Sequence, residues 1–561
     1  MKTITNNLSR VILAIVAVAL IVGVVLAFAA PIGGFFSGTI GKLNEVGNGD
    51  MWELGNYGNG ESDNPELIYY NVSLMAAPAN GGTATFTGTN AGLTTMSLTG
   101  EKTVGLSAQE SDGYYFQGWY SGDSATLLSV NRSYAPTVAS ETSLIASYAK
   151  AGLYDGNGNL LADWDTLVNT YGFRVDFDFD TNTCTSDPAS FGYIVENNAA
   201  LANGTRLVIP EGVTSIGSYA FNCCKTLTDI SVPDSVSTVG KRAFAASALE
   251  SMVFGEDSQL TEIAEFCFYS CKNLQYVSLP DGITSIGRAA FGECTSLTSV
   301  GSIGSNASVE WPEHITIISD RAFENCYNIS SVEIPTYVTS IGASAFAVCT
   351  SLTEIYIPAN VESIGRLAFQ AGNAFGRRAE VQSIRVDPNN PVFHSENNCL
   401  IETASKTLIL GCQYSVIPTD GSVTAIGESA FGHCANLTSI EIPASVTTID
   451  SAAFAYCQDL TSVTFGENSQ LTTIGDQAFR NSVYLYSIEI PAGVTTIGKS
   501  AFLSCKNLES ITINSATMVA HNGSLKSSDE LEAIYVPANL VSSYKAADGW
   551  SEFANLIQAI Q

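Results

Sequence analysis

Residues 423–443 read VTAIGESAFGHCANLTSIEIP, and close variants of this string return along more than half of the chain. Its first part recurs as VTSIGSYAFNCC (213–224), ITSIGRAAFGEC (283–294), VTSIGASAFAVC (338–349) and VTTIGKSAFLSC (494–505). The Phe of this part falls at 221, 244, 268, 291, 323, 346, 369, 431, 454, 479 and 502. Six of the ten intervals are 23 residues, and the two long ones contain insertions around 300–315 and 376–420. Eleven repeats of this period predict a stacked solenoid, not a globule.

The second part of the unit, LxxIxIP, predicts a short β-strand. Side chains alternate along a strand, so Ile440 and Ile442 face the core and Glu441 faces solvent, while Leu437 turns in from the preceding bend. One unit cannot bury this apolar row alone, and stacking joins the strands into a parallel ladder with one continuous core. At about 4.8 Å per strand, eleven units give a ladder on the order of 50 Å long.

The first part of the unit supplies the opposite wall. Its Phe residues are expected to stack into an aromatic spine along the solenoid. Its Gly is expected where the backbone turns sharply or approaches its neighbour, because a Cβ would clash there. These glycines are Gly217, Gly287, Gly342, Gly427 and Gly498.

The combined pattern resembles the BspA-like leucine-rich repeat from Leu207 to the end of the chain. The resemblance implies an α/β-type repeat solenoid that is mostly β, with a parallel strand ladder. It also implies a surface protein that acts in adhesion, since relatives of this kind bind matrix or host proteins. We assign the repeats to residues 206–530 and a helical C-terminal cap to 531–561, where Trp550 and Phe553 would cover the open end.

Three segments precede the repeats. Residues 32–63 are rich in Gly and Asn and predict a flexible linker, and residues 64–150 show short alternating strands typical of a small β-domain. The string GYYFQGWY at 113–120 resembles the signature of the internalin-type B-repeat, and its aromatic residues Tyr115, Phe116 and Trp119 are expected to form the domain core. Residues 151–205 are a connector with a short helix starting near Asp163.

The N-terminus predicts a membrane segment. Lys2 and Arg10 precede an uncharged run from Val11 to Ala30, which is long enough to span a bilayer and is followed by Pro31. The positive charges place the N-terminus in the cytoplasm and the rest of the chain outside. We favour a retained signal anchor on the extracellular face of the plasma membrane over a cleaved signal peptide. Ala27-Phe28-Ala29 leaves cleavage and secretion open.

Charge and motifs exclude several functions. The chain has 54 acidic and 24 basic residues and a formal charge of −30, which argues against a nucleic-acid partner. No GxSxG, HExxH, phosphate-binding or dinucleotide motif occurs, and His433 beside Cys434 is chance adjacency within the repeat. The sequence therefore predicts no catalytic residues, no metal site and no cofactor.

The 13 cysteines suggest disulfides in an exported chain, but eight of them stand three residues after the repeat Phe. Such a column is expected to be structural, with a small, weakly polar side chain in a narrow slot. Cys399 and Cys412 differ, since they flank a predicted hairpin. For this pair the sequence leaves a disulfide and two free thiols equally open.

The third and fifth positions of LxxIxI are expected to face solvent and to carry any ligand surface. Tyrosine and arginine are favoured interface anchors. The candidate ligand-face residues are Tyr276, Glu333, Glu354, Tyr356, Arg385, Glu441 and Glu489. The expected function is recognition of proteins or glycans on host or neighbouring cells. Two alternatives remain: a face that serves only solubility, and an envelope component that assembles laterally with itself.

Overall fold

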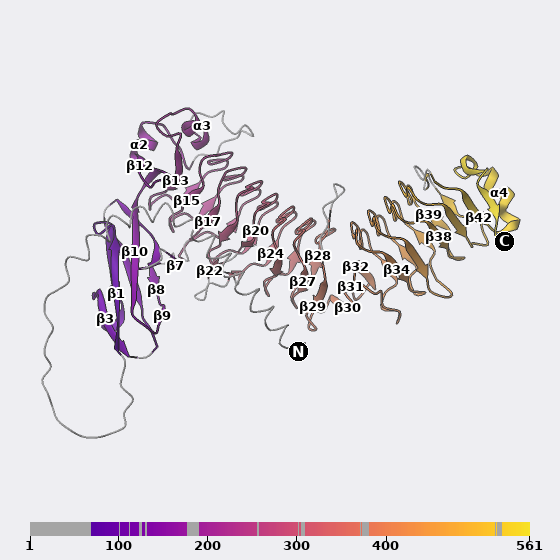
Figure 1. Ribbon diagram of the computed structural model, residues 1–561, viewed down its shortest axis with the longest axis horizontal. Helices are drawn as coiled ribbons and strands as arrows, with labels where there is room; N and C mark the ends of the chain where they lie inside the picture. The colour runs from indigo at the N-terminus through magenta and orange to yellow at the C-terminus, as the bar shows by residue number, and fades with distance from the viewer. Residues whose placement is uncertain are drawn as a thin grey trace, which may run out of the picture.

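The structure is a computed structural model that describes residues 69–561 apart from short gaps. The gaps are residues 100, 112, 123–125, 130–131, 177–189, 255–256, 301, 304–308, 313, 371, 373–380, 522, 524 and 526–529. The predicted membrane run 11–30 and linker 32–63 lie outside the described residues. Among the helices of the described part, none is both long and apolar enough to cross a membrane. Figure 1 shows a small β-domain beside one end of a long row of stacked coils.

The small β-domain has a five-stranded sheet in the order β3-β1-β10-β6-β7 and a three-stranded sheet in the order β2-β5-β8. Phe116 and Trp119 on β6 are buried in its core, as predicted, whereas Tyr115 is only half-buried. The strands are β1 (Tyr69–Ala77), β2 (Gly82–Phe86), β3 (Thr95–Thr99), β4 (Lys102–Thr103), β5 (Leu106–Glu110), β6 (Tyr114–Ser121), β7 (Leu127–Ser129), β8 (Ser133–Tyr134), β9 (Thr137–Val138) and β10 (Thr142–Lys150).

A short helical segment closes the first end of the solenoid. It contains β11 (Gly152–Asp155), β12 (Leu160–Asp163), α2 (Trp164–Asn169) and α3 (Phe191–Glu196). Helix α2 begins where the sequence predicts a helix, and the Asp163 carboxylate accepts the Thr166 N–H at 2.8 Å. The rings of Phe173 and Phe191 lie 5.6 and 5.3 Å from the ring of Phe221. Aromatic side chains therefore cover the first Phe of the repeats.

Each coil contributes one strand to a parallel ladder, which we call the strand ladder. Its side away from the core is the strand face. The strands are β13 (Gly204–Val208), β15 (Asp229–Ser231), β17 (Ser251–Val253), β19 (Tyr276–Ser278), β21 (Ser299–Val300), β25 (Ser331–Glu333), β27 (Glu354–Ile357), β29 (Ser383–Val386), β34 (Ser439–Ile442), β36 (Ser462–Phe465), β38 (Ser487–Ile490), β40 (Ser510–Ile513), β42 (Ala533–Val536) and β43 (Ile557–Ala559). Every pairing observed between these strands is parallel, as predicted.

A second ladder of two-residue strands follows the turn after each long strand. Its members are β14 (Ser215–Ile216), β16 (Thr238–Val239), β18 (Glu262–Ile263), β20 (Ser285–Ile286), β24 (Ile317–Ile318), β26 (Ser340–Ile341), β28 (Ser363–Ile364), β33 (Ala425–Ile426), β35 (Thr448–Ile449), β37 (Thr473–Ile474), β39 (Thr496–Ile497) and β41 (Ala520–His521). All α-helices of the described part lie at the two ends of the solenoid or beside them, so the repeats themselves are β-strands and turns, not α/β units.

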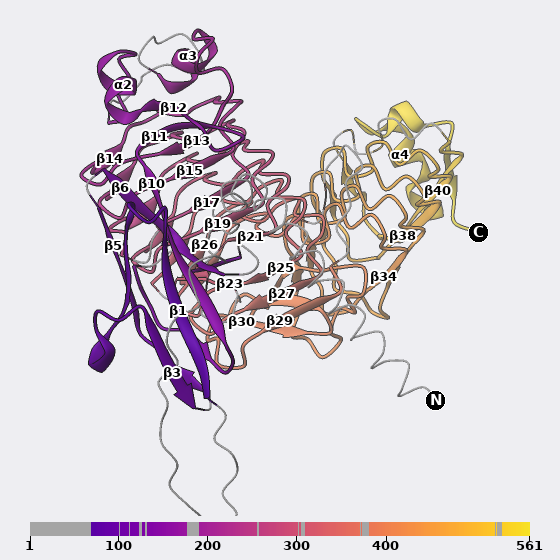
Figure 2. The same cartoon turned by 60° about the vertical axis from the view of Figure 1, so that its left-hand side comes forward.

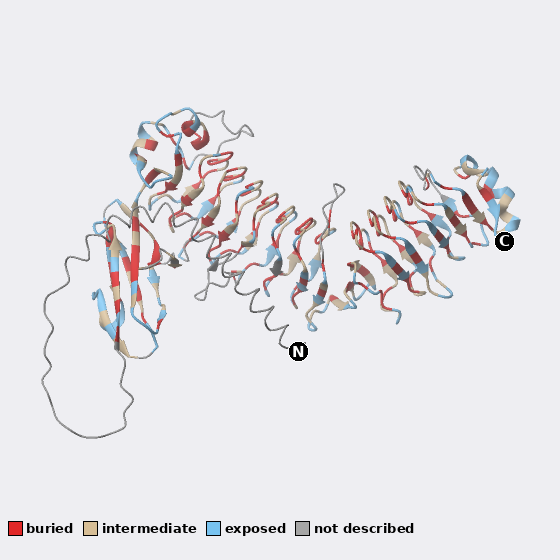
Figure 3. Cartoon of the chain, in the orientation of Figure 1, coloured by how far each residue is buried: buried red, intermediate tan, exposed pale blue. Residues whose placement is uncertain are grey.

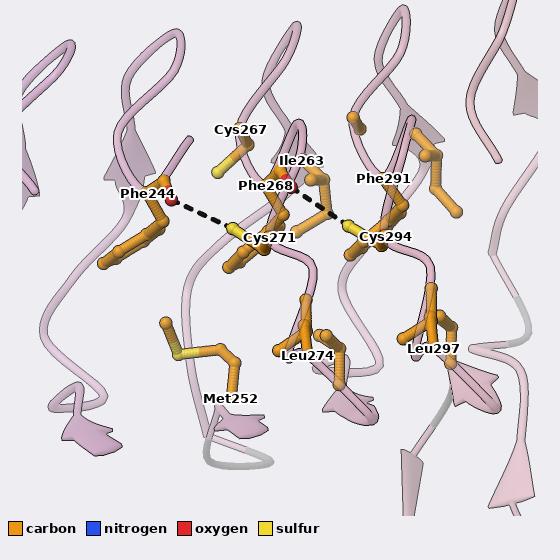
Figure 4. Packing of buried hydrophobic residues seen from close by; sticks show 14 of the residues in the cluster. Phe244, Met252, Ile263, Cys267, Phe268, Cys271, Leu274, Phe291, Cys294 and Leu297 are labelled. Carbon is orange, nitrogen blue, oxygen red and sulfur yellow. Dashed lines mark hydrogen bonds between the residues drawn. The ribbon is translucent and has the colours of Figure 1, made fainter. Parts of the chain in front are cut away.

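The repeat Phe residues form the predicted aromatic spine. From Phe221 to Phe369 and from Phe431 to Phe502, successive rings lie 5.1–5.5 Å apart and within 10° of parallel. Figure 4 shows the rings of Phe244, Phe268 and Phe291 in register from coil to coil. Figure 3 shows that buried residues recur in every coil along this row.

We call the segment between the Gly and the Cys position of each coil the turn wall. Its backbone N–H groups alternate between two kinds of hydrogen bond. In the coil of Phe244, the N–H groups of Arg242, Phe244 and Ala246 donate to carbonyls of the next coil. Those of Ala243 and Ala245 donate to carbonyls within their own coil. Arg242 and Ala246 adopt φ of 55° and 54°. A left-handed non-glycine residue costs about 1–2 kcal/mol, and the inter-coil bonds offset this cost.

The repeat glycines lie where neighbouring coils approach closely. A Cβ on Gly287 would lie 2.7 Å from the carbonyl oxygen of Ile263, and one on Gly427 would lie 2.8 Å from that of Leu408. Neither glycine has a left-handed φ. Close approach, not a left-handed turn, therefore explains these two positions.

The cysteine column is a ladder of hydrogen-bond donors. Cys294 donates its S–H to the carbonyl of Phe268 at 3.0 Å, and Cys457 donates to that of Phe431 at 3.1 Å. Figure 4 marks two of these bonds with dashed lines. Burial raises the pKa of Cys505 to about 12, so its proton stays in place to be donated. In one of the three coils that lack this cysteine, Ser482 makes the same bond to Phe454 at 3.1 Å.

Serine is therefore expected to replace a column cysteine better than alanine does. Cys457→Ser keeps a donor to the Phe431 carbonyl, and Cys457→Ala removes it, so alanine should cost about 1 kcal/mol more in the free energy of unfolding. Urea denaturation of the two variants beside the parent measures this difference. An alanine variant as stable as the serine variant would show that the column only fills space.

The solenoid is interrupted once, which corrects the prediction of one continuous core. Buried apolar side chains form two clusters, one ending at Cys412 and one beginning at Cys399. The two clusters meet in the joint, residues 387–418, which contains β30 (Phe393–Glu396), β31 (Cys399–Glu402) and β32 (Thr407–Leu410). The second Phe stack ends against Gly411, where any side chain would overlap the ring of Phe431.

The joint also contains the cysteine pair for which the sequence left a disulfide and two free thiols open. Cys399 and Cys412 are both free thiols and both buried. Leu400 pairs with Leu410 across β31 and β32, so Cys412 lies one residue beyond the position opposite Cys399. The two residues belong to different core clusters. Among the described cysteines, Cys223 is disulfide-bonded, a feature that the repeat pattern did not single out.

Residues 538–561 cover the last coil, as the sequence predicts for a cap. They contain η2 (Ala538–Leu540), α4 (Val541–Ala546) and η3 (Ser551–Phe553). Tyr544 and Trp550 are buried and meet edge to face at 5.1 Å. The indole N–H of Trp550 donates to the carbonyl of Val519 at 2.9 Å, and the backbone N–H of Val519 donates to the Tyr544 hydroxyl at 2.9 Å. The cap therefore satisfies the backbone just before β41.

Candidate functional site

From β27 onward, the strand face carries exposed polar and aromatic side chains. In β27, β34 and β38 the residues alternate between exposed and buried, as the LxxIxI pattern predicts. Glu354, Tyr356, Arg385, Glu441 and Glu489 are all exposed at their predicted outward positions. Figure 2 shows β27, β29, β34 and β38 following one another along this side of the molecule.

Three exposed side chains of β27 and β29 and the half-buried Asp387, which follows β29, form two linked pairs. The register places Tyr356 beside Arg385 and Glu354 beside Ser383. Tyr356 donates its hydroxyl to Asp387 at 2.8 Å, and Arg385 lies 3.2 Å from Glu354. The hydrogen bond to Asp387 raises the pKa of Tyr356, and bonds from the backbone N–H of Asn389 and from Tyr356 lower the pKa of Asp387. The phenol and the guanidinium are therefore pre-oriented on the face, which favours binding.

The carboxylates farther along the face are unpaired within the described residues. Glu441 and Glu489 stand on β34 and β38, and no basic group of the described part lies within ion-pair distance of either. Thr464 on β36 lies beside Glu441 in the register and is also exposed. This half of the face is thus acidic and hydroxyl-rich.

The first coils differ, because the small β-domain lies against them. Arg132 of that domain bonds to Glu110 of its own domain at 2.7 Å, to Glu211 at 2.6 Å and to Asp234. The last two residues follow β13 and β15. One guanidinium therefore joins the domain to the edge of two coils, and sequence reasoning missed this contact.

Burial agrees with this docking. Arg206 on β13 donates to Gln117 on β6, and Val208 at an outward position is fully buried. Tyr120 is buried although it lies outside the core cluster of its own domain. Burial raises its pKa, and the charges of Arg206 and Asp229 in the first coils also influence that pKa. The small domain thus covers the start of the strand face.

Two of the predicted ligand residues, Tyr276 and Glu333, are not among the exposed side chains that the structure describes. Tyr276 on β19 is half-buried, and burial raises its pKa to about 12, so it is less exposed than the sequence predicts for an anchor. The reason is the first insertion, whose β22 (Ser302–Ile303) lies against β19. For Glu333 the structure describes the strand β25 but not the side chain.

No group of three or more potential metal-ligating side chains occurs within the described residues. The ring of His433 stacks on Tyr456 at 4.4 Å, and burial raises the pKa of Cys434 above its usual range. A protonated, buried thiol is not a nucleophile. The pair therefore has a structural explanation in the turn wall.

Comparison with known families agrees with this architecture. A model for the BspA type leucine rich repeat region matches six copies over residues 199–307, 304–384 and 424–547, more than half of the chain. The chain belongs to the BspA-type leucine-rich repeat family. BspA-type repeats account for the solenoid and leave residues 69–150 unmatched, so the likeness of that domain to a B-repeat stays a prediction. The matching family model describes a leucine-rich repeat region.

Several solved structures resemble this BspA-type chain. A leucine rich cell surface protein from Faecalibacterium prausnitzii is 26% identical with a TM-score of 0.45, over 62% of this chain and 90% of that one. A leucine-rich repeat protein from Bacteroides ovatus is 22% identical with a TM-score of 0.41, over 64% and 84%. One from Eubacterium ventriosum is 24% identical with a TM-score of 0.43, over 51% and 72%. No curated protein matches the chain.

Proposed function

We propose that this chain is a surface recognition protein that binds proteins or glycans of host or neighbouring cells through the exposed strand face. The observation that carries the proposal is the contrast between the two sides of the ladder from β27 onward. The inward residues are uniformly apolar, whereas the outward ones include Tyr356, Arg385, Glu441 and Glu489. A face that served only solubility would need no oriented tyrosine and arginine.

We further propose that the run 11–30 anchors the chain in the plasma membrane with the solenoid outside. The charge asymmetry around this run supports that orientation. Cleavage after Ala29 would instead give a secreted protein with the same ligand face. Protease added to intact cells should digest the repeats of an anchored chain, and a chain that resists it until lysis would contradict export.

Alanine at both Tyr356 and Arg385 is expected to weaken binding about tenfold or more, because each side chain is oriented on the face by a partner. Surface plasmon resonance against host and neighbouring-cell surface proteins and glycans measures the change. Tyr484→Ala is a matched control, since Tyr484 is 46% exposed and lies outside the outward columns.

The outcomes separate the alternatives. Weaker binding in the double variant with a normal control supports recognition through this face. Unchanged binding would remove the face from the account. Concentration-dependent sheets or filaments of the parent chain without binding to any partner would favour the envelope role instead.

A further inference from the structure

The joint carries two exposed apolar side chains that the repeat pattern does not reveal. Tyr414 and Val416 are 56% and 65% exposed, and Val416 is more exposed than any other large apolar residue of the described part. The residues between and after them, Ser415 and Ile417, are buried. This segment therefore continues the outward-inward alternation of the strand ladder although it is not a strand.

Hydrogen bonds hold the segment in place. Val416 donates its N–H to the carbonyl of Asn397 at 3.1 Å, and Ser415 donates its hydroxyl to that of Asn398. The side chain of Asn398 in turn accepts the N–H of Ile384 on β29 at 3.3 Å. In the strand ladder, the tip of the β30–β31 hairpin thus occupies the position of the strand after β29. Residues 414–417 occupy the next strand position.

This order puts Tyr414 and Val416 on the strand face, in one row with the pairs on β27 and β29. Val416 lies three strand spacings from Tyr356, which corresponds to about 14 Å. One protein segment can span this distance within an interface of ordinary size. Figure 2 shows β27, β29, β30 and β34 along this side.

The charges around the two apolar side chains are mostly negative. Glu354 and Glu441 are exposed on either side of the joint, and Asp387 at its start is half-buried. Arg385 is the one outward cation on the described parts of β27, β29 and β34. Arg385 forms an ion pair with Glu354 at 3.2 Å. The row is thus an apolar centre with an acidic margin.

We propose that the joint is the centre of the recognition face and binds a segment of another protein in which an apolar side chain is flanked by lysine or arginine. The apolar residue covers Tyr414 and Val416, and the cations face the carboxylates at the margin. This inference rests on the proposed use of the strand face, and it names the partner chemistry and the residues that select it.

The first coils show that the ladder edge holds such a cation. Arg132 of the docked β-domain lies against Glu211 and Asp234. Carboxylates at the edge of the strand ladder therefore already hold one guanidinium within this chain.

The test uses the full chain and synthetic 15-residue peptides with a central Leu-Trp pair flanked by four lysines. Two matched peptides replace the lysines by glutamates or the central pair by serines. Fluorescence anisotropy is recorded for the parent, for Tyr414→Ser with Val416→Ser, and for Tyr484→Ser with Tyr486→Ser. The last variant is the control, because these tyrosines are 46% and 44% exposed outside the outward columns.

The parent is expected to bind the lysine-flanked apolar peptide at least tenfold more tightly than either matched peptide. The joint variant should lose this preference with an unchanged thermal midpoint, and the control should keep it. Equal binding of the serine-centred peptide would reduce the effect to general attraction by an acidic chain and overturn the proposal. Binding to glycans alone, or self-association abolished by the joint variant, would overturn it as well.

These outcomes differ from those that test the recognition face itself. If Tyr356 and Arg385 prove necessary for partner binding while Tyr414 and Val416 do not, the face stands and the joint loses its role. If neither pair matters, both proposals fail together.

Discussion

Phe454→Ala is expected to lower the free energy of unfolding by about 3–5 kcal/mol, the range for an aromatic residue removed from a packed core. Phe454 is fully buried between Phe431 and Phe479, with ring distances of 5.1 and 5.3 Å. Alanine removes contacts with both neighbouring coils, because each ring of the spine packs on two others. The loss should therefore act on the interfaces between coils and not only within one coil.

Urea denaturation followed by circular dichroism measures this loss. Tyr484→Ala is a suitable control, since an exposed side chain should change stability by less than about 0.5 kcal/mol. Phe454→Leu should fall between the two, because leucine refills part of the volume. A Phe454→Ala variant that lost less than about 1 kcal/mol would show that the spine does not hold the coils together.

Trp550→Ala is expected to open the C-terminal end of the solenoid at a cost of about 3–5 kcal/mol, again as a large buried aromatic residue. The indole fills the space beside Tyr544 and donates to the carbonyl of Val519. Without it the end of the last coils is exposed to water, and a repeat array loses stability at its uncovered end first.

Hydrogen exchange resolves where the change occurs. The amides of β39, β40 and β41 should exchange faster in Trp550→Ala, while those of β15 and β16 at the far end keep their rates. Trp550→Phe keeps most of the ring and loses the hydrogen bond, so it should cost about 1 kcal/mol. Uniform acceleration in all coils would mean that the array unfolds as one unit and that the cap is not a local device.

The parts of the fold that could be predicted are those that repeat. Phe454, Leu437 and Ile440 recur at fixed intervals, so their shared environment is visible in one sequence. The same holds for Cys457, although its function as a donor became clear only with the carbonyl of Phe431 in place. The outward positions Tyr356 and Arg385 followed from strand alternation alone.

The parts that could not be predicted depend on contacts without a period. Arg132 meets Asp234 across 102 residues, and neither side chain belongs to a motif that points to the other. Tyr276 occupies an outward position by the rule, but it is half-buried on a strand that contacts β22 of the first insertion. His433 and Arg242 adopt left-handed φ without the glycine or asparagine that would announce such a turn.

The joint shows both limits at once. The sequence marked 376–420 as an insertion and placed a hairpin there, but predicted a core continuous across it. The coil around Tyr414 is shortened, so it lacks the LxxIxI template by which outward residues were chosen. Its two exposed apolar side chains were therefore found only in the structure.

Hydroxyl-radical footprinting of the chain alone and with a bound partner tests the central claim most directly. The account predicts protection of Tyr356, Tyr414 and Val416 on the strand face, with the side chains of the turn wall, such as Tyr456, unchanged. Protection of the turn wall with full reactivity of the strand face would contradict it.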